Sequence, residues 1–206
     1  MTPYPRIEKN RTLIPGFALY GGDYFVEGKE RLVWELVGEA DPRDFILNSV
    51  MLPIIRHWIG SFRKFGFILE PHGQNTLLEA DQSGRIHRIV HRDLNVGLDM
   101  RRRRDLSLPD GEINRYNRME SGEFNSIGYD KFMGGHFFDQ LVAEIQKRHP
   151  KLQPEDFQEP CREEFGRLFP DHAEYLPRTV NYFSEERDEF GKPLYQDTGK
   201  LPRWRP

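Results

Sequence analysis

Cysteine is nearly missing from this 206-residue sequence, in which Cys161 stands alone. A single cysteine excludes an intramolecular disulfide. It also excludes a cysteine-rich zinc site and an all-cysteine iron–sulfur cluster built within one chain. A reducing, cytoplasmic setting is therefore expected.

Long apolar runs and a large net charge are missing as well. No window approaches the about 20 apolar residues of a membrane span, and the opening MTPYPRIEKNR lacks the apolar centre of a signal peptide. The formal net charge is only -3, so the chain carries no overall basic footprint for nucleic acid. We therefore predict a soluble protein whose partners are neither membranes nor nucleic acids.

Helical periodicity is strongest between Asp41 and Gly66 (DPRDFILNSVMLPIIRHWIGSFRKFG). Asp41 can cap this helix, Pro42 suits its first position, and Gly66 ends it. Pro53 is expected to kink it, because the proline ring removes a donor and clashes with the preceding turn. Apolar spacing predicts further helices over residues 29–37, 129–149 and 154–169.

Strand-like runs are short and follow the long helix. They cover Phe67 to Glu70, Thr76 to Ala80 and Ile86 to Val90, and the turn residues 81–84 predict a hairpin between the last two. Another short strand is predicted within residues 13–20. The mixture of long helices and short strands predicts an α+β fold.

Two polar stretches show little periodicity. Residues 92–125 are arginine-rich and punctuated by glycine, which predicts a long functional or surface loop with little regular structure. Within this stretch, Arg101 to Arg104 are interpreted as a solvated basic face rather than an anion clamp. The tail after Ser184 is charged and rich in proline and glycine, so it is predicted to be extended, docked or partly disordered.

Polar side chains with metal-binding chemistry gather between Gly66 and Asp93 (GFILEPHGQNTLLEADQSGRIHRIVHRD). Glu70, Asn75 and Asp93 offer oxygen ligands of the kind that magnesium accepts. If HGQN is the bend between the first two of the three strands, these groups lie at neighbouring strand ends. They would then meet at one mouth suited to a metal and a triphosphate. His72 and Gln74 add groups that could contact phosphate or carboxylate oxygens.

Each of these residues also has a structural interpretation. Glu70 could be a solvated strand end, and Asp93 could form a local ion pair with Arg92. His72, Gln74 and Asn75 are common turn residues. The remaining histidines considered show no metal-ligand spacing and are interpreted as structural: His87, His91, His136, His149 and His172.

The HRDLN segment at residues 91–95 invites comparison with the catalytic loop of protein kinases. That loop needs an asparagine where this chain has Leu98, and no glycine-rich loop followed by a strand lysine is present. A protein kinase is therefore not expected, and a phosphate-binding cleft with kinase-like general architecture stays open as an alternative.

The run from Gly66 to Asp93 resembles the signature of the C-terminal half of the IucA/IucC-type siderophore synthetases, ligases that work independently of non-ribosomal peptide synthetases. The resemblance is specific over about residues 41–97. The family's motif places are occupied here by Gly66, Glu70, His72, Gln74, Asn75, Gly84, Arg92 and Asp93.

The resemblance implies an ATP- and Mg2+-dependent enzyme with a small antiparallel palm-like sheet and a mostly helical thumb. Such enzymes adenylate a citrate-like polycarboxylate and condense it with an amine or alcohol. The resemblance implies that Glu70, Asn75 and Asp93 hold magnesium and phosphates. It assigns His72, Gln74 and Arg92 to catalysis, with His72 and Gln74 also contacting the nucleotide or the activated carboxylate.

On the same resemblance the chain is one domain over residues 1–206, with four parts. These are a lead-in and palm edge (1–40), a helix with site-bearing strands (41–100), a loop and helical thumb (101–183) and a tail (184–206). Family enzymes are much longer, and this chain contains no equivalent of their first half before Asp41. A protein partner supplying that half is therefore expected.

Three alternatives follow from the same observations. The chain could be one part of a split enzyme, a truncated homologue, or a non-catalytic subunit that binds a siderophore or carboxylate, and it could also form a homodimer. The same region resembles ferric siderophore reductases of the FhuF type, which hold an iron–sulfur cluster through several cysteines. Cys161 alone does not support that chemistry.

Overall fold

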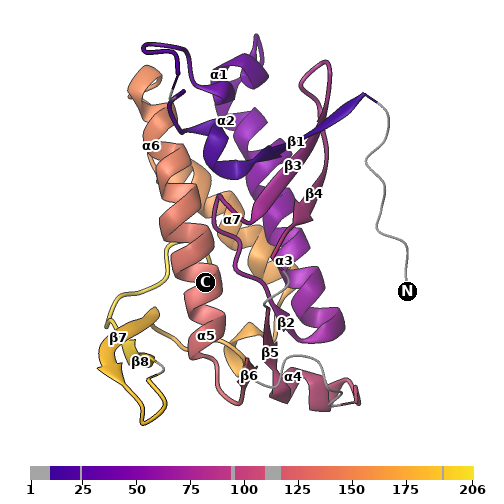
Figure 1. Ribbon diagram of the computed structural model, residues 1–206, viewed down its shortest axis with the longest axis vertical. Helices are drawn as coiled ribbons and strands as arrows, with labels where there is room; N and C mark the ends of the chain where they lie inside the picture. The colour runs from indigo at the N-terminus through magenta and orange to yellow at the C-terminus, as the bar shows by residue number, and fades with distance from the viewer. Residues whose placement is uncertain (1–9, 24, 94–95, 110–116, 192) are drawn as a thin grey trace.

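The computed structural model describes residues 10–23, 25–93, 96–109, 117–191 and 193–206. Most of the predicted lead-in, at residues 2–9, lies outside the described residues. The described part is an α+β fold, as predicted from the sequence. Figure 1 shows the β1-β3-β4 sheet and the β7-β8 hairpin at opposite ends of the molecule, with long helices between them.

The helices and strands have the following bounds. The helical elements are η1 (Gly16–Leu19), α1 (Leu32–Val37), α2 (Pro42–Phe45), η2 (Ile46–Met51), α3 (Leu52–Phe65), α4 (Met100–Asp105), α5 (Glu123–Ser126), η3 (Ile127–Phe138), α6 (Asp139–Arg148), α7 (Glu155–Leu168) and η4 (His172–Glu174). The strands are β1 (Arg11–Pro15), β2 (Phe67–Ile68), β3 (Thr76–Asp81), β4 (Ile86–His91), β5 (Gly97–Asp99), β6 (Arg118–Met119), β7 (Asn181–Arg187) and β8 (Pro193–Asp197).

The predicted long helix is present as the continuous run α2, η2 and α3. Its start is capped by the Asp41 carboxylate, which accepts a hydrogen bond from the Asp44 N–H over 2.9 Å. The segment η2 is π-helical and lies directly before Pro53, whose ring cannot take part in the regular hydrogen-bond ladder. Gly66 ends the run at φ 66°, a left-handed conformation that favours glycine. The expected cap at Asp41 and the expected stop at Gly66 are therefore confirmed.

The apolar face of α3 is the centre of the core. Trp58 stacks on Phe62 and meets Tyr129 edge-on, while Tyr129 packs against Phe165 of α7. By length and composition alone, with a mean hydropathy of 1.2, the described run Pro42–Phe65 would suffice to cross a membrane. That was not expected from the sequence. Half of the apolar window is buried, and the side chains that face inward make α3 the core helix of this fold: Ile54, Ile55, Trp58, Ile59 and Phe62.

A second long helical run consists of α5, η3 and α6. It begins earlier than the predicted start at Tyr129, and twelve of its residues form the π-helical segment η3. Gly134 lies where the ring of Trp204 crosses the helix, and an added Cβ would come within 2.5 Å of that ring. The end of the chain is thereby packed against the middle of this run.

The strands form three small sheets rather than one. The strand order in the first is β1-β3-β4, all antiparallel, and β3 and β4 form the predicted hairpin. The second has the order β2-β5-β6, in which β2 pairs antiparallel with β5 and β5 pairs parallel with β6. HGQN does lie between β2 and β3, but these two strands belong to different sheets. The segment between them instead crosses from one sheet to the other.

The prediction of an irregular loop over residues 92–125 is also wrong for its described part. That part contains β5, α4, β6 and the start of α5, while residues 94–95 and 110–116 lie outside the described residues. Asp99 caps α4 by accepting from the Arg102 N–H over 2.9 Å. The arginine-rich composition hid a short helix with a side-chain cap.

Three of the four residues Arg101 to Arg104 are not a solvated basic face. Arg103 is 7% exposed and donates to the Phe65 carbonyl over 3.0 Å, at the end of α3. Arg101 pairs with Asp99 over 2.9 Å. Arg102 and Arg103 fasten α4 to the end of α3, because their donors satisfy carbonyl groups that a helix end leaves open. Arg104 is exposed, as predicted, and pairs with a surface glutamate.

The C-terminal tail is docked, which was one of its predicted states. Its first part forms most of the antiparallel β7-β8 hairpin, which the sequence did not indicate. Trp204 is 2% exposed, and its Nε1–H donates to Asp139 over 3.1 Å. Arg205 forms a buried ion pair with Asp130, with nitrogen and oxygen 2.9 Å apart. The tail therefore completes the core instead of trailing from it.

Candidate functional site

The HGQN loop between β2 and β3 is held in a tight turn. The N–H of Asn75 donates to the His72 carbonyl over 3.0 Å, and the Phe17 N–H donates to the Gly73 carbonyl over 3.0 Å. A Cβ at Gly73 would lie 2.6 Å from the hydroxyl oxygen of Tyr20 and 2.8 Å from the nitrogen of Phe17. Only glycine allows η1 to approach the loop this closely.

The end of β4 lies beside the same loop. Thr76 is paired with His91, and the Arg92 N–H donates to the Asn75 carbonyl over 3.0 Å. The next residue, Asp93, has φ 67°, which is uncommon for a residue other than glycine. Strained backbone of this kind concentrates at functional sites. Arg92 and Asp93 are thus delivered to the loop by strand pairing, although they lie far along the chain from Glu70.

Two carboxylates of the predicted site, Glu70 and Asp93, interact electrostatically. Burial raises the pKa of Glu70, and the nearby charge of Asp93 raises it further. Two acidic groups that disfavour each other's charge are an arrangement that a cation would relieve. In the folded chain, Glu70 and Asp93 therefore lie close enough for the charge of Asp93 to affect Glu70.

Asn75 has a different position from the one predicted. Its side chain is 5% exposed, and its backbone carbonyl carries the contact to Arg92. It is not among the residues that line the adjacent cleft. The described geometry shows Asn75 as the residue that joins the loop to β4.

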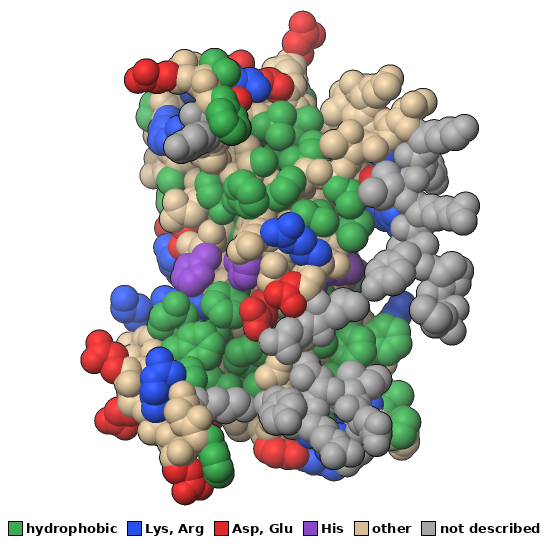
Figure 2. Space-filling model, viewed as in Figure 1, with side chains coloured by type: hydrophobic (Ala, Val, Ile, Leu, Met, Phe, Trp, Pro, Cys, Tyr) green, Lys and Arg blue, Asp and Glu red, His purple; other side chains and the backbone are tan. Residues whose placement is uncertain are grey.

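An open cleft of about 600 Å3 lies over the loop. Three predicted site residues, His72, Gln74 and Arg92, line it. The other lining residues, which the sequence did not single out for function, are Phe17, Tyr20, Gly73 and His136. In Figure 2, histidine side chains form a band across the middle of this face, with hydrophobic side chains on both sides of it.

His72 is oriented by its own loop. Its Nδ1 accepts a hydrogen bond from the Gln74 N–H over 3.3 Å, so in the neutral ring the proton lies on Nε2. Burial lowers the pKa of His72, and so do His136 and, more weakly, Arg92, against an opposing effect of Asp93. A neutral imidazole with an outward N–H donor is the resulting form at neutral pH.

His136 was interpreted as structural from the sequence, and the structure places it in the lining of the same cleft as His72. It is contributed by η3, on the far side of the cleft from the HGQN loop. No spacing rule links the two histidines, because strand pairing and helix packing bring them together. The pair of glycines before His136 was the only local irregularity in that stretch.

The donor set fits a hard cation but does not complete a site for one. Within the described residues, no group of three or more histidine, cysteine, aspartate or glutamate side chains is arranged to hold a metal ion. Glu70 and Asp93 supply two carboxylates, and magnesium commonly takes its remaining ligands from water and substrate phosphates. The chemistry of the residues is therefore compatible with magnesium bound together with a polyphosphate.

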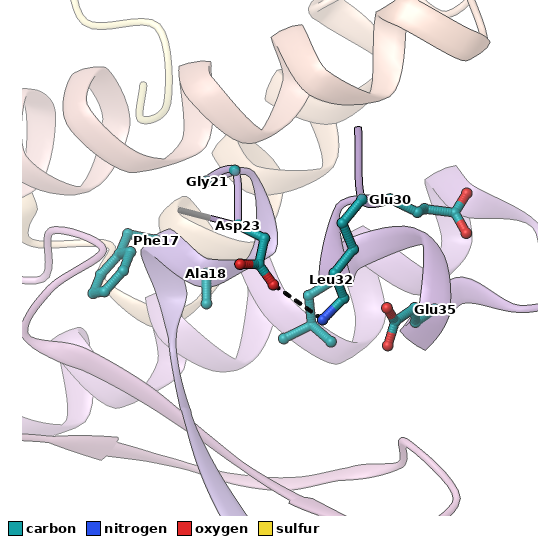
Figure 3. Close-up of a pocket in the computed structure, with 9 residues that line it drawn as sticks. Phe17, Ala18, Gly21, Asp23, Glu30, Leu32 and Glu35 are labelled. Carbon is teal, nitrogen blue, oxygen red and sulfur yellow. Dashed lines mark ion pairs between the residues drawn. The ribbon is translucent and has the colours of Figure 1, made fainter. Parts of the chain in front are cut away.

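A second cavity of about 230 Å3 lies on the other side of Phe17. In Figure 3, Asp23 points towards the ammonium of Lys29, and the carboxylates of Glu30 and Glu35 lie at the end away from Phe17. Asp23 pairs with Lys29 over 3.2 Å, and Glu30 pairs with Arg148. Two of the three carboxylates that line this cavity are thus paired with a cation.

Comparison with known proteins gives the fold its class. No family model matches the sequence, and none of the curated proteins matches it. Among solved structures, the fold is shared with siderophore synthetases. The FhuF-type part of the sequence resemblance has no support from these structures.

Three of these structures illustrate the similarity. The petrobactin biosynthesis protein AsbB from Bacillus anthracis str. Sterne has a TM-score of 0.61 and 15% identity over 96% of this chain. The aerobactin synthetase IucC of Klebsiella pneumoniae has a TM-score of 0.59 and 12% identity over 82% of this chain. The aerobactin synthetase IucA from the same species has a TM-score of 0.56 and 11% identity over 83% of this chain.

The similarity covers only part of each relative. This chain matches 36% of AsbB, 31% of IucC and 34% of IucA. It therefore spans about a third of the length of the structures it resembles. At these identities the comparison shows the fold, and the chemistry has to be argued from the cleft.

Proposed function

We propose that this chain forms the palm and thumb of an ATP- and Mg2+-dependent carboxylate–amine ligase of siderophore biosynthesis. The observation that carries the proposal is the convergence of the HGQN loop and the end of β4 on one cleft. That convergence occurs in a fold shared with petrobactin and aerobactin biosynthesis proteins. The reaction would join a citrate-like polycarboxylate to an amine or alcohol through an acyl-adenylate.

The residues of the loop take distinct roles in this proposal. Glu70 and Asp93 would hold magnesium, with Asn75 fixing the loop against β4 and offering its amide as the third ligand. Bound magnesium would neutralise negative charge on the ATP phosphates. The carboxylates draw support from the raised pKa of Glu70, caused by burial and then by Asp93.

The cleft residues would bind and orient the reacting groups. Arg92 supplies a fixed positive charge for a phosphate or carboxylate. His72, held by its Nδ1 contact, presents Nε2–H as a neutral donor, and Gln74 adds an amide at the exposed rim. Donors fixed in this way stabilise charge that develops during acyl transfer without having to reorganise.

The rest of the nucleotide site would come from outside these residues. The match to about a third of each synthetase favours a cleft completed by a second polypeptide segment. A non-catalytic subunit that binds a carboxylate-rich siderophore is the second candidate, and the open cleft with Arg92 at its rim favours it. Both candidates use the same face, and the cytoplasm is the expected place for either.

Isothermal titration of the purified chain with ATP separates the two candidates. The ligase proposal expects magnesium-dependent heat, and the carboxylate-binding candidate expects heat with citrate but none with ATP. A pyrophosphate-release assay with citrate and candidate amines then tests turnover. Absence of ATP binding both alone and with a co-purified partner would overturn the ligase proposal.

A further inference from the structure

Two histidines from opposite walls of the cleft pack on the same aromatic ring. The rings of His72 and Phe132 have centroids 5.8 Å apart and meet edge-on. The rings of Phe132 and His136 have centroids 5.7 Å apart. Phe132 thus sets the spacing between an imidazole on the HGQN loop and an imidazole on η3.

Neighbouring side chains orient the ring of His136, but none of the described residues forms a hydrogen bond with its nitrogens. It meets the Tyr182 ring at 90°, with centroids 6.2 Å apart, and its backbone carbonyl accepts from the Tyr20 hydroxyl over 3.3 Å. Among the described residues, no side chain or backbone group is hydrogen-bonded to its ring nitrogens. The side chain is exposed to the cleft, so those nitrogens are available to a ligand.

The backbone around His136 is unusual in a way that places its ring. The twelve residues of η3 are π-helical, a conformation that is rare and frequent at functional sites. A wider helix shifts each successive side chain around the axis relative to an α-helix. Phe132 and His136 both reach the cleft side of the run in this geometry.

The two walls of the cleft differ in the kind of side chain they carry. The loop wall carries Arg92 and Gln74, which suit an anionic group. The opposite side carries aromatic rings, and the protein's own Lys131 ammonium lies 4.7 Å from the centroid of one of them, Tyr182. Aromatic rings of this kind attract ammonium groups.

His136 is kept in the form that accepts a hydrogen bond. Burial lowers its pKa, Lys131 lowers it further, and Asp139 opposes them. The same cleft is lined by His72, whose lowered pKa favours its neutral form, by Tyr20, whose raised pKa does the same, by the amide of Gln74 and by the cation of Arg92. A neutral imidazole therefore faces the open space with a free acceptor nitrogen.

We propose that His136 binds the acceptor amine, with its ring nitrogen accepting a hydrogen bond from an amine N–H. This inference rests on the proposed ligase function and names the residue that would select the second substrate class, a primary amine. Phe132 and Tyr182 would cover the carbon chain next to the amine, while the carboxylate would lie towards Arg92. The two reactants would then approach each other from opposite walls.

The test is nuclear magnetic resonance of the chain carrying 15N-labelled histidine. n-Butylamine is the probe, and tetramethylammonium is the comparison because it has positive charge but no N–H group. We expect n-butylamine to shift the ring nitrogen resonance of His136, and tetramethylammonium to leave it unchanged. Equal shifts with both cations, or no shift with either, would overturn the proposal.

Matched variants separate binding from folding. His136→Phe keeps a ring against Phe132 and Tyr182 but removes the acceptor. The readout in this variant is the ring nitrogen resonance of His72, and its shift on addition of n-butylamine is expected to disappear. His149→Phe makes the same substitution in another exposed histidine, which stacks on Trp34 with centroids 5.7 Å apart, and should leave the response intact. Persistence of the His72 response in folded His136→Phe would assign amine binding to another residue.

The outcome is distinguishable from that of the proposed function. ATP heat without an amine response would reject the role of His136 and leave the ligase proposal in place. An amine response without ATP heat, with or without a partner, would reject the ligase and leave an amine-binding cleft.

Discussion

The Asn75 carbonyl accepts a hydrogen bond from the Arg92 N–H over 3.0 Å. This bond joins the loop after β2 to the end of β4, and it places Asp93 where its charge reaches Glu70. This hydrogen bond continues the pairing of β3 with β4 and thereby assembles the polar cluster. Changes to the loop and changes to the end of β4 should consequently affect the same binding event.

Asp93→Asn tests the electrostatic part of that event. Asparagine tolerates the left-handed backbone at φ 67°, so the fold should be kept while the charge is lost. We expect the affinity for ATP in the presence of magnesium, measured by isothermal titration, to fall at least tenfold, which is about 1.4 kcal/mol. The thermal stability should change little.

Asp44→Asn is the matched control, because Asp44 is exposed at the start of α2. Asn75→Ala is a less clean probe than it looked from the sequence. Its side chain is 5% exposed, so its loss should lower stability as well as binding. Unchanged ATP affinity in Asp93→Asn would remove Asp93 from the site.

Gly73→Ala tests the contact between η1 and the loop. The new Cβ would lie 2.8 Å from the Phe17 nitrogen, so the hydrogen bond from Phe17 to the Gly73 carbonyl has to lengthen or break. We expect a loss of about 1–3 kcal/mol in the free energy of unfolding, measured by urea denaturation, together with weaker ligand binding.

Gly60→Ala provides the comparison for that substitution. An added Cβ at Gly60 would meet no atom within 4 Å, and the position lies inside α3. Alanine there should stabilise the helix by about 0.5–1 kcal/mol. If both glycine variants behave alike, the close approach at Gly73 has no energetic consequence.

Thiol chemistry at Cys161 reports on the core. Burial raises the pKa of Cys161 to about 12, and its side chain is 0% exposed. At pH 8 only about one thiol in ten thousand would be ionised, and the thiolate is the reactive form. We expect a disulfide reagent to label Cys161 only as fast as the protein unfolds, and at once in denaturant. Rapid labelling of the folded chain would show that α7 opens locally.

The sequence predicted those features that are set by neighbouring residues. The cap at Asp41, the stop at Gly66 and the hairpin between β3 and β4 depend on local backbone preferences, and all are present. The pairing of β2 with β5 depends on residues 31 positions apart, Phe67 and Leu98, so no local pattern could reveal it.

The same distinction explains what was missed in the site. Glu70, His72 and Gln74 stood out because polar residues interrupted an expected strand. His136 did not, because it follows a helical pattern and becomes a cleft residue only when η3 packs beside the loop. Arg101 to Arg103 resembled part of a solvated charge run because their carbonyl acceptors lie in other segments.

The buried ion pair between Arg205 and Asp130 makes a prediction with a defined pH dependence. Both side chains are at most 3% exposed, and Arg205 also donates to the Pro177 carbonyl over 2.8 Å. Arg205→Met leaves the Asp130 carboxylate buried without its cation, and we expect the free energy of unfolding to fall by about 3–5 kcal/mol at pH 7. Chemical denaturation of wild type and variant measures this loss.

The loss should shrink as the pH falls. Burial already raises the pKa of Asp130 above its usual value even though Arg205 opposes the shift, and removal of Arg205 raises that pKa further. The folded variant then binds a proton that the unfolded chain releases above its ordinary carboxyl pKa, so its stability decreases as the pH rises through that interval. At pH 5 the variant should therefore be closer to wild type than at pH 7. The double variant Asp130→Asn/Arg205→Met lacks the carboxylate and should show no such recovery, and a recovery in the double variant would assign the effect to another group.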